Sequence, residues 1–131
     1  MNNRTFPRIV SILAMLWLGA CSDDADPIVP PVASRTPVTF IEIGSDYCEP
    51  CKLMRPVMDS LRRKYGSEQL TVLFYDVIKN KAEADPYKIR VMPTQVFLDR
   101  DGFEFHRHEG FYPEREIDSL LATRGLTILR P

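Results

Sequence analysis

The sequence predicts an α/β fold class with a central mixed β-sheet flanked by helices. Two observations point to this architecture. Strand-like runs alternate with helix-like runs along the chain, and a tight-turn signal joins the last two strand-like runs. Alternating elements place helices against both faces of a sheet, and a tight turn joins antiparallel neighbours, so the sheet is expected to be mixed.

Two apolar runs predict the first two strands. Residues 38–43 (VTFIEI) are rich in β-branched and aromatic side chains, and Gly44 and Ser45 end this run. Residues 70–77 (LTVLFYDV) are almost continuously apolar. Such a run is expected of a strand that is buried on both faces within a parallel sheet.

A helical period separates these two runs, because apolar side chains recur every four residues from Cys51 to Tyr65. The predicted inner face consists of Leu53, Val57 and Leu61, with Met54, Met58 and Tyr65 beside them. Gly66 is a natural stop for this helix. Pro56 is expected to kink it, because proline removes a backbone hydrogen bond inside a helix.

The second half of the domain predicts a helix, a hairpin and a final helix. Residues 80–88 are polar and predict a short helix. Residues 94–99 (TQVFLD) predict a strand, Asp101-Gly102 a tight turn, and residues 103–109 (FEFHRHE) its hairpin partner. The last helix begins at Pro113 with Glu114 and Glu116, presents Ile117, Leu120 and Leu121 to the core, and ends at Gly125. The predicted order is β-α-β-α-β-β-α.

The composition excludes several classes of protein. Hydrophobic residues make up 44% of the 131 residues and charged residues 27%, which excludes a wholly disordered chain and a multi-pass membrane protein. Lys and Arg number 17 against 18 Asp and Glu, so the chain has no basic excess for binding nucleic acid. The 3 cysteines are too few for a disulfide-stapled miniprotein.

The N-terminal residues predict a secretion signal. Arg4 and Arg8 precede a short apolar stretch, residues 9–20, which as a helix would span roughly 18 Å and fall short of a bilayer core. Leu18-Gly19-Ala20-Cys21 resembles the bacterial lipobox, in which the cysteine is lipidated and becomes the mature N-terminus. The alternatives are a plain secretory signal with an incidental cysteine, or an uncleaved anchor.

These features predict three parts of the chain. Residues 1–20 are a lipoprotein signal peptide, residues 21–37 the lipidated Cys21 with a Pro- and Asp-rich tether, and residues 38–131 the folded domain. The tether could hold the domain on the order of 50 Å from the lipid. The expected location is the bacterial cell envelope, with the protein anchored to a membrane and facing the periplasm or extracytoplasmic space.

Cys48 and Cys51 fall where the first strand gives way to the first helix. Two cysteines at this spacing in a first helical turn can form a disulfide, and the helix N-terminus favours the thiolate of the first. Cys48 is therefore the expected nucleophile, and Cys51 the residue that resolves a mixed disulfide. The alternatives are a structural disulfide, or half of a zinc site completed by His106 and His108. We otherwise expect these histidines to be exposed strand residues, and we predict no metal and no cofactor.

Several motifs resemble the thioredoxin superfamily at family spacing and over residues 38 to about 125. They are the redox motif Tyr47-Cys48-Glu49-Pro50-Cys51-Lys52, the helix proline Pro56, the loop Met92-Pro93-Thr94, the turn Asp101-Gly102, and Gly110 after the last strand. Each motif is weak by itself, but together and in order they are specific. The resemblance implies a thioredoxin-like fold and a thiol–disulfide oxidoreductase.

The resemblance also assigns roles near the cysteines. Pro93 is expected to be cis and to lie against the disulfide, while the backbone of Met92 pairs with an extended client. Client binding is also assigned to Tyr47, Glu49 and Pro50. Tyr47 departs from the family's usual tryptophan.

Glu42 resembles the buried acid that moves the proton of the second cysteine in this family. It shares a strand face with Val38 and Phe40, so we expect it to be buried, which would raise its pKa. The alternative is a surface glutamate near a strand end. Residues 70–77 contain no lysine of the kind that thioredoxins place near the buried acid.

The leading hypothesis is a lipid-anchored extracytoplasmic enzyme that reduces disulfides in exported proteins, with apocytochrome c as one candidate client and a membrane electron carrier as its reductant. Asp46 and Glu49 flank Cys48 with negative charge that opposes its thiolate, and this favours a reductant. The alternatives are a disulfide oxidant or isomerase, and a thioredoxin-fold lipoprotein that binds Cu(I) through the cysteines with Met54 or Met92. Nothing in the sequence requires more than a monomer.

Overall fold

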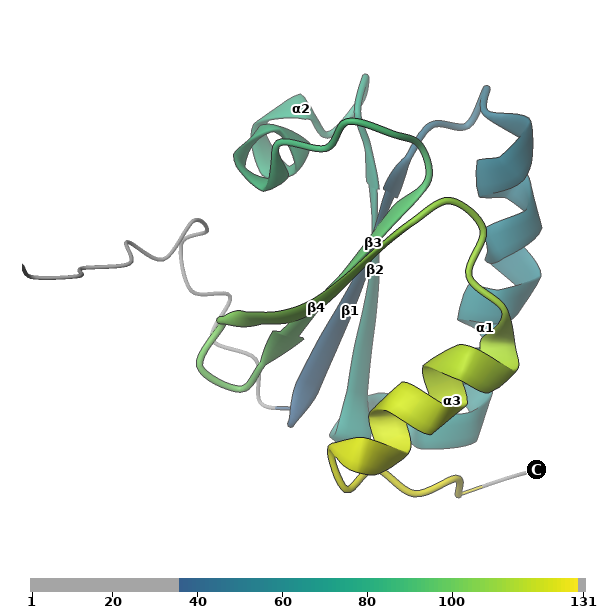
Figure 1. Ribbon diagram of the computed structural model, residues 1–131, viewed down its shortest axis with the longest axis vertical. Helices are drawn as coiled ribbons and strands as arrows, with labels where there is room; N and C mark the ends of the chain where they lie inside the picture. The colour runs from purple at the N-terminus through teal and green to yellow at the C-terminus, as the bar shows by residue number, and fades with distance from the viewer. Residues whose placement is uncertain (1–35, 130–131) are drawn as a thin grey trace, which may run out of the picture.

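The computed structural model describes residues 36–129. The elements along the chain are β1 (Val38–Gly44), α1 (Glu49–Gln69), β2 (Leu70–Asp76), α2 (Lys81–Ala84), the 3₁₀-helix η1 (Asp85–Tyr87), β3 (Thr94–Asp99), β4 (Glu104–Glu109) and α3 (Glu114–Thr123) (Figure 1). This is the predicted order. The predicted signal peptide, the predicted lipidation site Cys21 and most of the predicted tether lie outside the described residues.

The described strands form one mixed sheet in the order β2-β1-β3-β4. β1 pairs in parallel with β2, and α1 makes the crossover that parallel neighbours require. β1 pairs antiparallel with β3, and β3 pairs antiparallel with β4 across the predicted hairpin. β1 is therefore hydrogen-bonded on both sides, and its last residue leads into the loop before α1.

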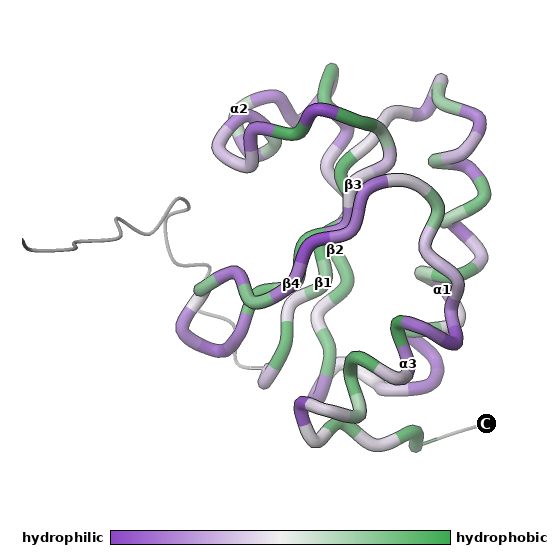
Figure 2. Tube along the Cα trace, in the orientation of Figure 1, coloured by the Kyte–Doolittle hydropathy of each residue, from purple (hydrophilic) through white to green (hydrophobic). Residues whose placement is uncertain are grey.

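Helices cover both faces of the sheet, as predicted (Figure 1). On one face, α1 and α3 pack against a core that includes Phe40, Met54, Leu61, Phe97, Ile117 and Leu121. On the other face, α2 and η1 cover a smaller cluster of Ile41, Ile43, Ala84, Tyr87, Val96 and Leu98. Figure 2 shows hydrophobic colour along β1 and β2, whereas β4 is mostly hydrophilic. Within residues 36–129, no helix is long and apolar enough to cross a membrane.

The predicted inner face of α1 is wrong at Leu53, which is 60% exposed, whereas Met54 and Leu61 are fully buried. Each step of four residues turns a helix about 40° beyond a full circle, because a turn holds about 3.6 residues. Two such steps separate Leu53 from Leu61. Leu53 therefore lies at the edge of the apolar face and points to solvent.

Two other expectations about α1 and β2 need revision. Side chains of β2 pack against the clusters on both faces, as predicted, but the strand lies at an edge of the described sheet, and residues 71–75 are therefore only partly buried. α1 keeps helical backbone angles through Pro56, and its break lies at Gly66, whose φ is 67°. Glycine adopts this positive φ without steric cost, so Gly66 interrupts the helix as its sequence position predicts.

Candidate active site

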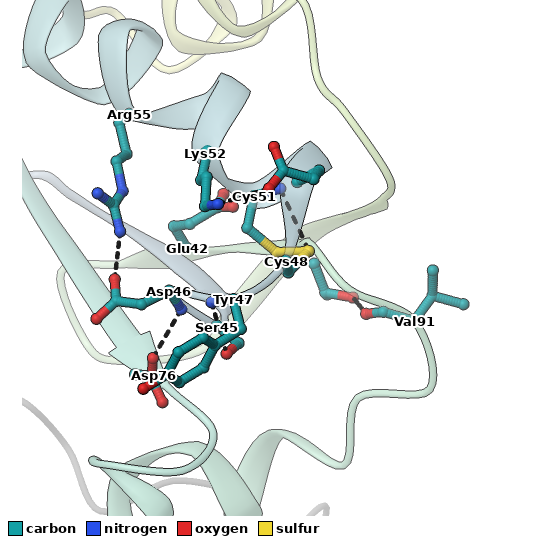
Figure 3. Close-up of a disulfide and its surroundings, with 12 residues drawn as sticks. Glu42, Ser45, Asp46, Tyr47, Cys48, Cys51, Lys52, Arg55, Asp76 and Val91 are labelled. Carbon is teal, nitrogen blue, oxygen red and sulfur yellow. Dashed lines mark hydrogen bonds and ion pairs between the residues drawn. A yellow bond between two sulfur atoms is a disulfide. The ribbon is translucent and has the colours of Figure 1, made fainter.

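The cysteine pair lies where β1 ends and α1 begins. Cys48 is the N-cap residue of α1, and the backbone N–H of Cys51 donates a hydrogen bond to Cys48 Sγ at 3.3 Å. The two sulfurs form a disulfide, with the Cα atoms 5.2 Å apart (Figure 3). Cys48 is partly exposed, whereas Cys51 is only 3% exposed. A reagent from solvent therefore reaches Cys48 first, and the Cys51 N–H that donates to its sulfur favours the thiolate form.

Gly44, the last residue of β1, lies directly against Cys51. A Cβ atom at position 44 would lie 2.7 Å from Cys51 Sγ and 3.2 Å from Cys51 Cβ. Both distances are shorter than ordinary van der Waals contact, so the sulfur can occupy this place only because the strand ends in glycine. Sequence reasoning treated Gly44 as the end of a strand and missed this contact.

A network of backbone hydrogen bonds holds the loop that leads to Cys48. The Asp76 carboxylate, at the end of β2, accepts hydrogen bonds from the backbone N–H groups of Asp46, Ile78 and Lys79. These bonds favour the ionised carboxyl, the bond from Asp46 most of all, and they lower the pKa of Asp76. The parallel pairing of β1 and β2 therefore ties the loop before Cys48 to the loop that follows β2.

The acidic side chains around Cys48 are paired with cations. Asp46 forms ion pairs with Arg55 of α1 (Figure 3) and with Lys79, and Glu49 pairs with Lys52. Asp46 and Glu49 flank Cys48 as predicted, and each carboxylate has at least one cation beside it that offsets part of its charge. The partners of Asp46 lie 9 and 33 residues further along the chain.

The loop before β3 contains the predicted cis proline. The Met92–Pro93 peptide bond is cis, which confirms the expectation. Pro93 is buried, and its carbonyl accepts a hydrogen bond from the backbone N–H of Gly110 at 2.7 Å. The Thr94 hydroxyl donates to the carbonyl of Val91 at 2.7 Å. These two bonds hold the loop in place, and Met92 within it is exposed.

The other residues assigned to client binding are also at the surface. Tyr47 is 80% exposed, and Glu49 and Pro50 are exposed as well. Val91, which sequence reasoning did not single out, is exposed beside Met92 and appears in the surroundings of the disulfide (Figure 3). The cysteine pair thus has apolar and aromatic side chains near it that are accessible to a client.

Glu42 is fully buried on the face of β1 that α1 covers, as its alternation with Val38 and Phe40 predicts. Burial raises the pKa of Glu42 to about 8, and a hydrogen bond from Gln95 acts in the opposite direction. Glu42 precedes Gly44 by two residues on the same strand face, a separation of about 7 Å along a strand. Its carboxyl group is therefore placed on the side of the sheet where Gly44 contacts Cys51.

Gln95 is a further residue of this region that sequence reasoning missed. It is fully buried on β3 opposite Glu42, and its Nε2 donates a hydrogen bond to Glu42 Oε2 at 3.0 Å. The available signal was a polar side chain in the otherwise apolar run of residues 95–98, on the same face as Phe97. The two residues are 53 positions apart, so only the pairing of β1 with β3 brings them together.

His106 and His108 share one face of β4, as predicted, but they are half-buried and do not extend freely into solvent. His106 Nε2 lies 3.2 Å from the Tyr112 hydroxyl, and the ring of His108 stacks on Tyr112 with centroids 4.0 Å apart. Burial lowers the pKa of His106. Across residues 36–129, no three His, Cys, Asp or Glu side chains are grouped to hold a metal ion.

Comparison with known proteins identifies this arrangement. The thioredoxin family model matches residues 31–123. Thioredoxin of Bacillus subtilis is 29% identical over 84 residues, covering 64% of this chain and 79% of that protein. Thioredoxin-1 of Drosophila melanogaster is 43% identical over 66 residues, covering 50% and 61%. The structure of a mutant thioredoxin from Halobacterium salinarum NRC-1 matches with a TM-score of 0.60 at 28% identity, over 82% of this chain and 98% of that one.

Proposed function

This chain belongs to the thioredoxin family of thiol–disulfide oxidoreductases, and on that premise we propose that it reduces disulfides in exported proteins while anchored to a membrane by lipid. The anchor is Cys21, which follows a short apolar stretch within Leu18-Gly19-Ala20-Cys21. A domain held at the membrane surface would meet proteins as they emerge and could draw electrons from a membrane carrier. Apocytochrome c is one candidate client.

The different surroundings of the two cysteines support a reaction in two steps. In the reduced enzyme, the Cys48 thiolate attacks a client disulfide, forms a Cys48–client bond and releases one client sulfur as a thiolate. Cys51 then gives its thiol proton to the Glu42 carboxylate and attacks Cys48 Sγ. The Cys48–Cys51 bond forms as the Cys48–client bond breaks, and the second client sulfur leaves as a thiolate. Two electrons pass from the enzyme to the client, and a dithiol carrier returns them.

The observation that supports this assignment best is the contrast in exposure within one disulfide. Cys48 is partly exposed at a helix N-terminus, and Cys51 is buried against Gly44. An accessible thiolate suits attack on a large client, while a shielded thiol reacts only with the sulfur already beside it. Exposed Tyr47, Val91 and Met92 offer contacts to an unfolded apolar client segment.

Trapping tests the roles of the two cysteines. Cys51→Ser should accumulate mixed disulfides between Cys48 and clients, because the resolving attack is lost. Cys48→Ser is the matched control and should trap almost none. Non-reducing gels of membranes from cells that express each full-length variant measure the yield. Equal yields would contradict the assignment of roles, and no adduct from either variant would contradict exchange with exported proteins.

Fractionation tests the anchor separately. Cys21→Ala should leave the protein either uncleaved or released from membranes, because the residue that carries the lipid is gone. If the variant still behaves as an acylated membrane protein of unchanged size, the lipid anchor at Cys21 is wrong.

The alternative direction is oxidation or isomerisation of client disulfides. It is favoured by the pairing of Asp46 and Glu49 with cations, because those carboxylates then oppose the Cys48 thiolate less. The reduction potential of the Cys48–Cys51 pair separates the two directions. A reduction potential of about −270 mV, as in a reducing thioredoxin, supports a reductant. A potential of about −120 mV supports an oxidant.

A further inference from the structure

Glu42 and Gln95 form a polar pair within an apolar layer. Both side chains are fully buried, and they occupy paired positions on β1 and β3. The next pair along the same face is Phe40 and Phe97, whose rings contact edge to face at 5.0 Å. Aromatic and aliphatic residues fill the remainder of the same face.

The hydrogen bonding of the pair is incomplete. Gln95 Nε2 donates to Glu42 Oε2, but Glu42 Oε1 and Gln95 Oε1 have no hydrogen-bond partner among the described residues. Buried polar atoms without partners are unfavourable, so a pair kept for stability alone would be expected to satisfy both oxygens. The unpaired Glu42 Oε1 is instead available to a donor that the oxidised state lacks.

Cys51 supplies such a donor when the disulfide is reduced. In the disulfide its sulfur has no proton, whereas the Cys51 thiol has one. The sulfur lies against Gly44, two residues beyond Glu42 on the same face of β1. We propose that Gln95 is a positioning residue for thiol–disulfide exchange: its amide holds Glu42 by Oε2, so that Oε1 faces the proton of Cys51.

The Gln95 amide N–H suits this positioning role because it can only donate a hydrogen bond. It donates to Glu42 Oε2 whether the carboxyl is charged or neutral, so the proton that Glu42 gains or loses is directed to Oε1. It also stabilises the carboxylate, in opposition to burial, and so keeps part of Glu42 ionised near neutral pH. A lysine in β2 would supply positive charge instead, but the partner of Glu42 on β2 is Phe74.

Few other titratable groups face Glu42. From α1 the nearest in position is Cys51, from β2 the paired residue is Phe74, and from β3 it is Gln95. His108 of β4 pairs with the far side of Gln95 and stacks on Tyr112. The charged groups of the active-site loop are engaged in their own network of Asp46, Arg55, Asp76 and Lys79. The protonation of Glu42 should therefore depend on Gln95 more than on any charge.

The test is the pH dependence of the resolving step in Gln95→Met, which keeps the size of the side chain and removes the donor. A mixed disulfide is formed on Cys48 of the full chain, and release of the leaving thiol is followed at several pH values. Loss of the hydrogen bond should raise the pH midpoint by about one unit and slow release at pH 7 about tenfold. The alkylation rate of Cys48 should stay within twofold of the wild type.

Glu42→Gln is the matched background for this measurement. A residue that acts through the Glu42 carboxyl has no effect where that carboxyl is absent, so adding Gln95→Met to Glu42→Gln should change release less than twofold. Equal slowing in both backgrounds, or an unchanged pH midpoint in Gln95→Met alone, would overturn the proposal. Neither result depends on the direction of the physiological reaction or on the lipid anchor, so a failure here is distinct from a failure of the proposed function.

A measurement on the wild-type chain guards against a variant that does not fold. The side-chain amide signals of Gln95 in the oxidised protein should shift with pH at the same midpoint as the Glu42 carboxyl carbon. Glu42→Gln should abolish that shift. An amide signal of Gln95 that stays constant while Glu42 titrates would overturn the proposal without any change at position 95.

Discussion

The two ends of α1 are built for different tasks. At its N-terminus, Cys48 is partly exposed, and the ion pairs of Asp46 and Glu49 lie at the surface. At the other end, Tyr65 is fully buried, and its hydroxyl donates to Asp118 of α3 at 2.9 Å. Lys64 Nζ pairs with the same Asp118 at 2.6 Å.

This difference separates reactivity from stability along a single helix. The packed end gains from burial and from contacts with α3, whereas the N-terminal end keeps an accessible sulfur that accepts a hydrogen bond from the Cys51 N–H. Substitutions at the N-terminal end should therefore alter exchange more than folding, and substitutions at the packed end should do the reverse.

The largest contrast is expected between two glycines, one that contacts Cys51 at the start of α1 and one near the end of α1. In Gly44→Ala the new Cβ would lie 2.7 Å from Cys51 Sγ, so the disulfide can form only if the helix start moves. We expect the equilibrium for disulfide formation in a glutathione buffer to fall at least tenfold. Gly66→Ala, at a position where φ is 67° and ψ is 164°, should lower the free energy of unfolding by about 1–3 kcal/mol and leave that equilibrium unchanged. Similar redox equilibria in the two variants would contradict the division.

A second contrast uses two leucines of α1. Leu61 is fully buried against the sheet, so Leu61→Ala should lower the free energy of unfolding by about 3 kcal/mol. Leu53 is mostly exposed, so Leu53→Ala should change it by less than about 0.5 kcal/mol. Urea unfolding of the oxidised proteins measures both. Alkylation of Cys48 in the reduced proteins should be unaffected by Leu61→Ala, and a large change there would show that the two ends are coupled.

Leu53 also shows where sequence reasoning succeeds and where it stops. The cysteine pair, the cis proline and the bounds of β3 were predicted because each has a local signal within a few residues. Leu53 was misplaced because a period of four drifts around a helix whose turn is about 3.6 residues. Whether a side chain faces the core depends on its angle around the helix axis, and a spacing of four residues describes that angle poorly.

The partners within the site could not be predicted for a different reason. Gln95 reaches Glu42 only through strand pairing, and Lys79 reaches Asp46 only because β2 ends beside β1. Spacing along the chain contains no information about which polar residues meet across strands. The buried position of Glu42 was predictable from alternation. Gln95, whose hydrogen bond opposes the effect of that burial on the pKa of Glu42, was not predictable.

The free energy of unfolding should depend on pH through Glu42 and not through the packed end of α1. Because burial raises the pKa of Glu42 to about 8, the folded state keeps a proton that the unfolded chain releases above its ordinary pKa of 4.5. The folded state therefore loses stability as pH rises from about 4.5 to 8. Glu42→Gln has no such proton and should be more stable than the wild type by on the order of 3 kcal/mol at pH 8, with little difference at pH 4.5.

Urea unfolding of the oxidised protein at several pH values measures this difference, and disulfide cysteines do not contribute to it. The same variant should slow the resolving step, because Cys51 loses its proton acceptor. Parallel loss of stability with pH in the wild type and Glu42→Gln would mean that Glu42 is not the group that titrates.

The smallest effect is expected from the surface charges at the start of α1. Arg55→Gln removes one of the two cations paired with Asp46, so the Asp46 carboxylate should then oppose the Cys48 thiolate more strongly. We expect alkylation of Cys48 to slow by less than about threefold at low ionic strength, and the difference to vanish near 1 M salt, where exposed charges are screened within about 3 Å. Arg115→Gln, on the exposed side of α3, is the matched control and should have no effect at either salt concentration. A loss in Arg55→Gln that persists at high salt would show that Arg55 acts through the shape of the loop at the N-terminal end of α1 and not through its charge.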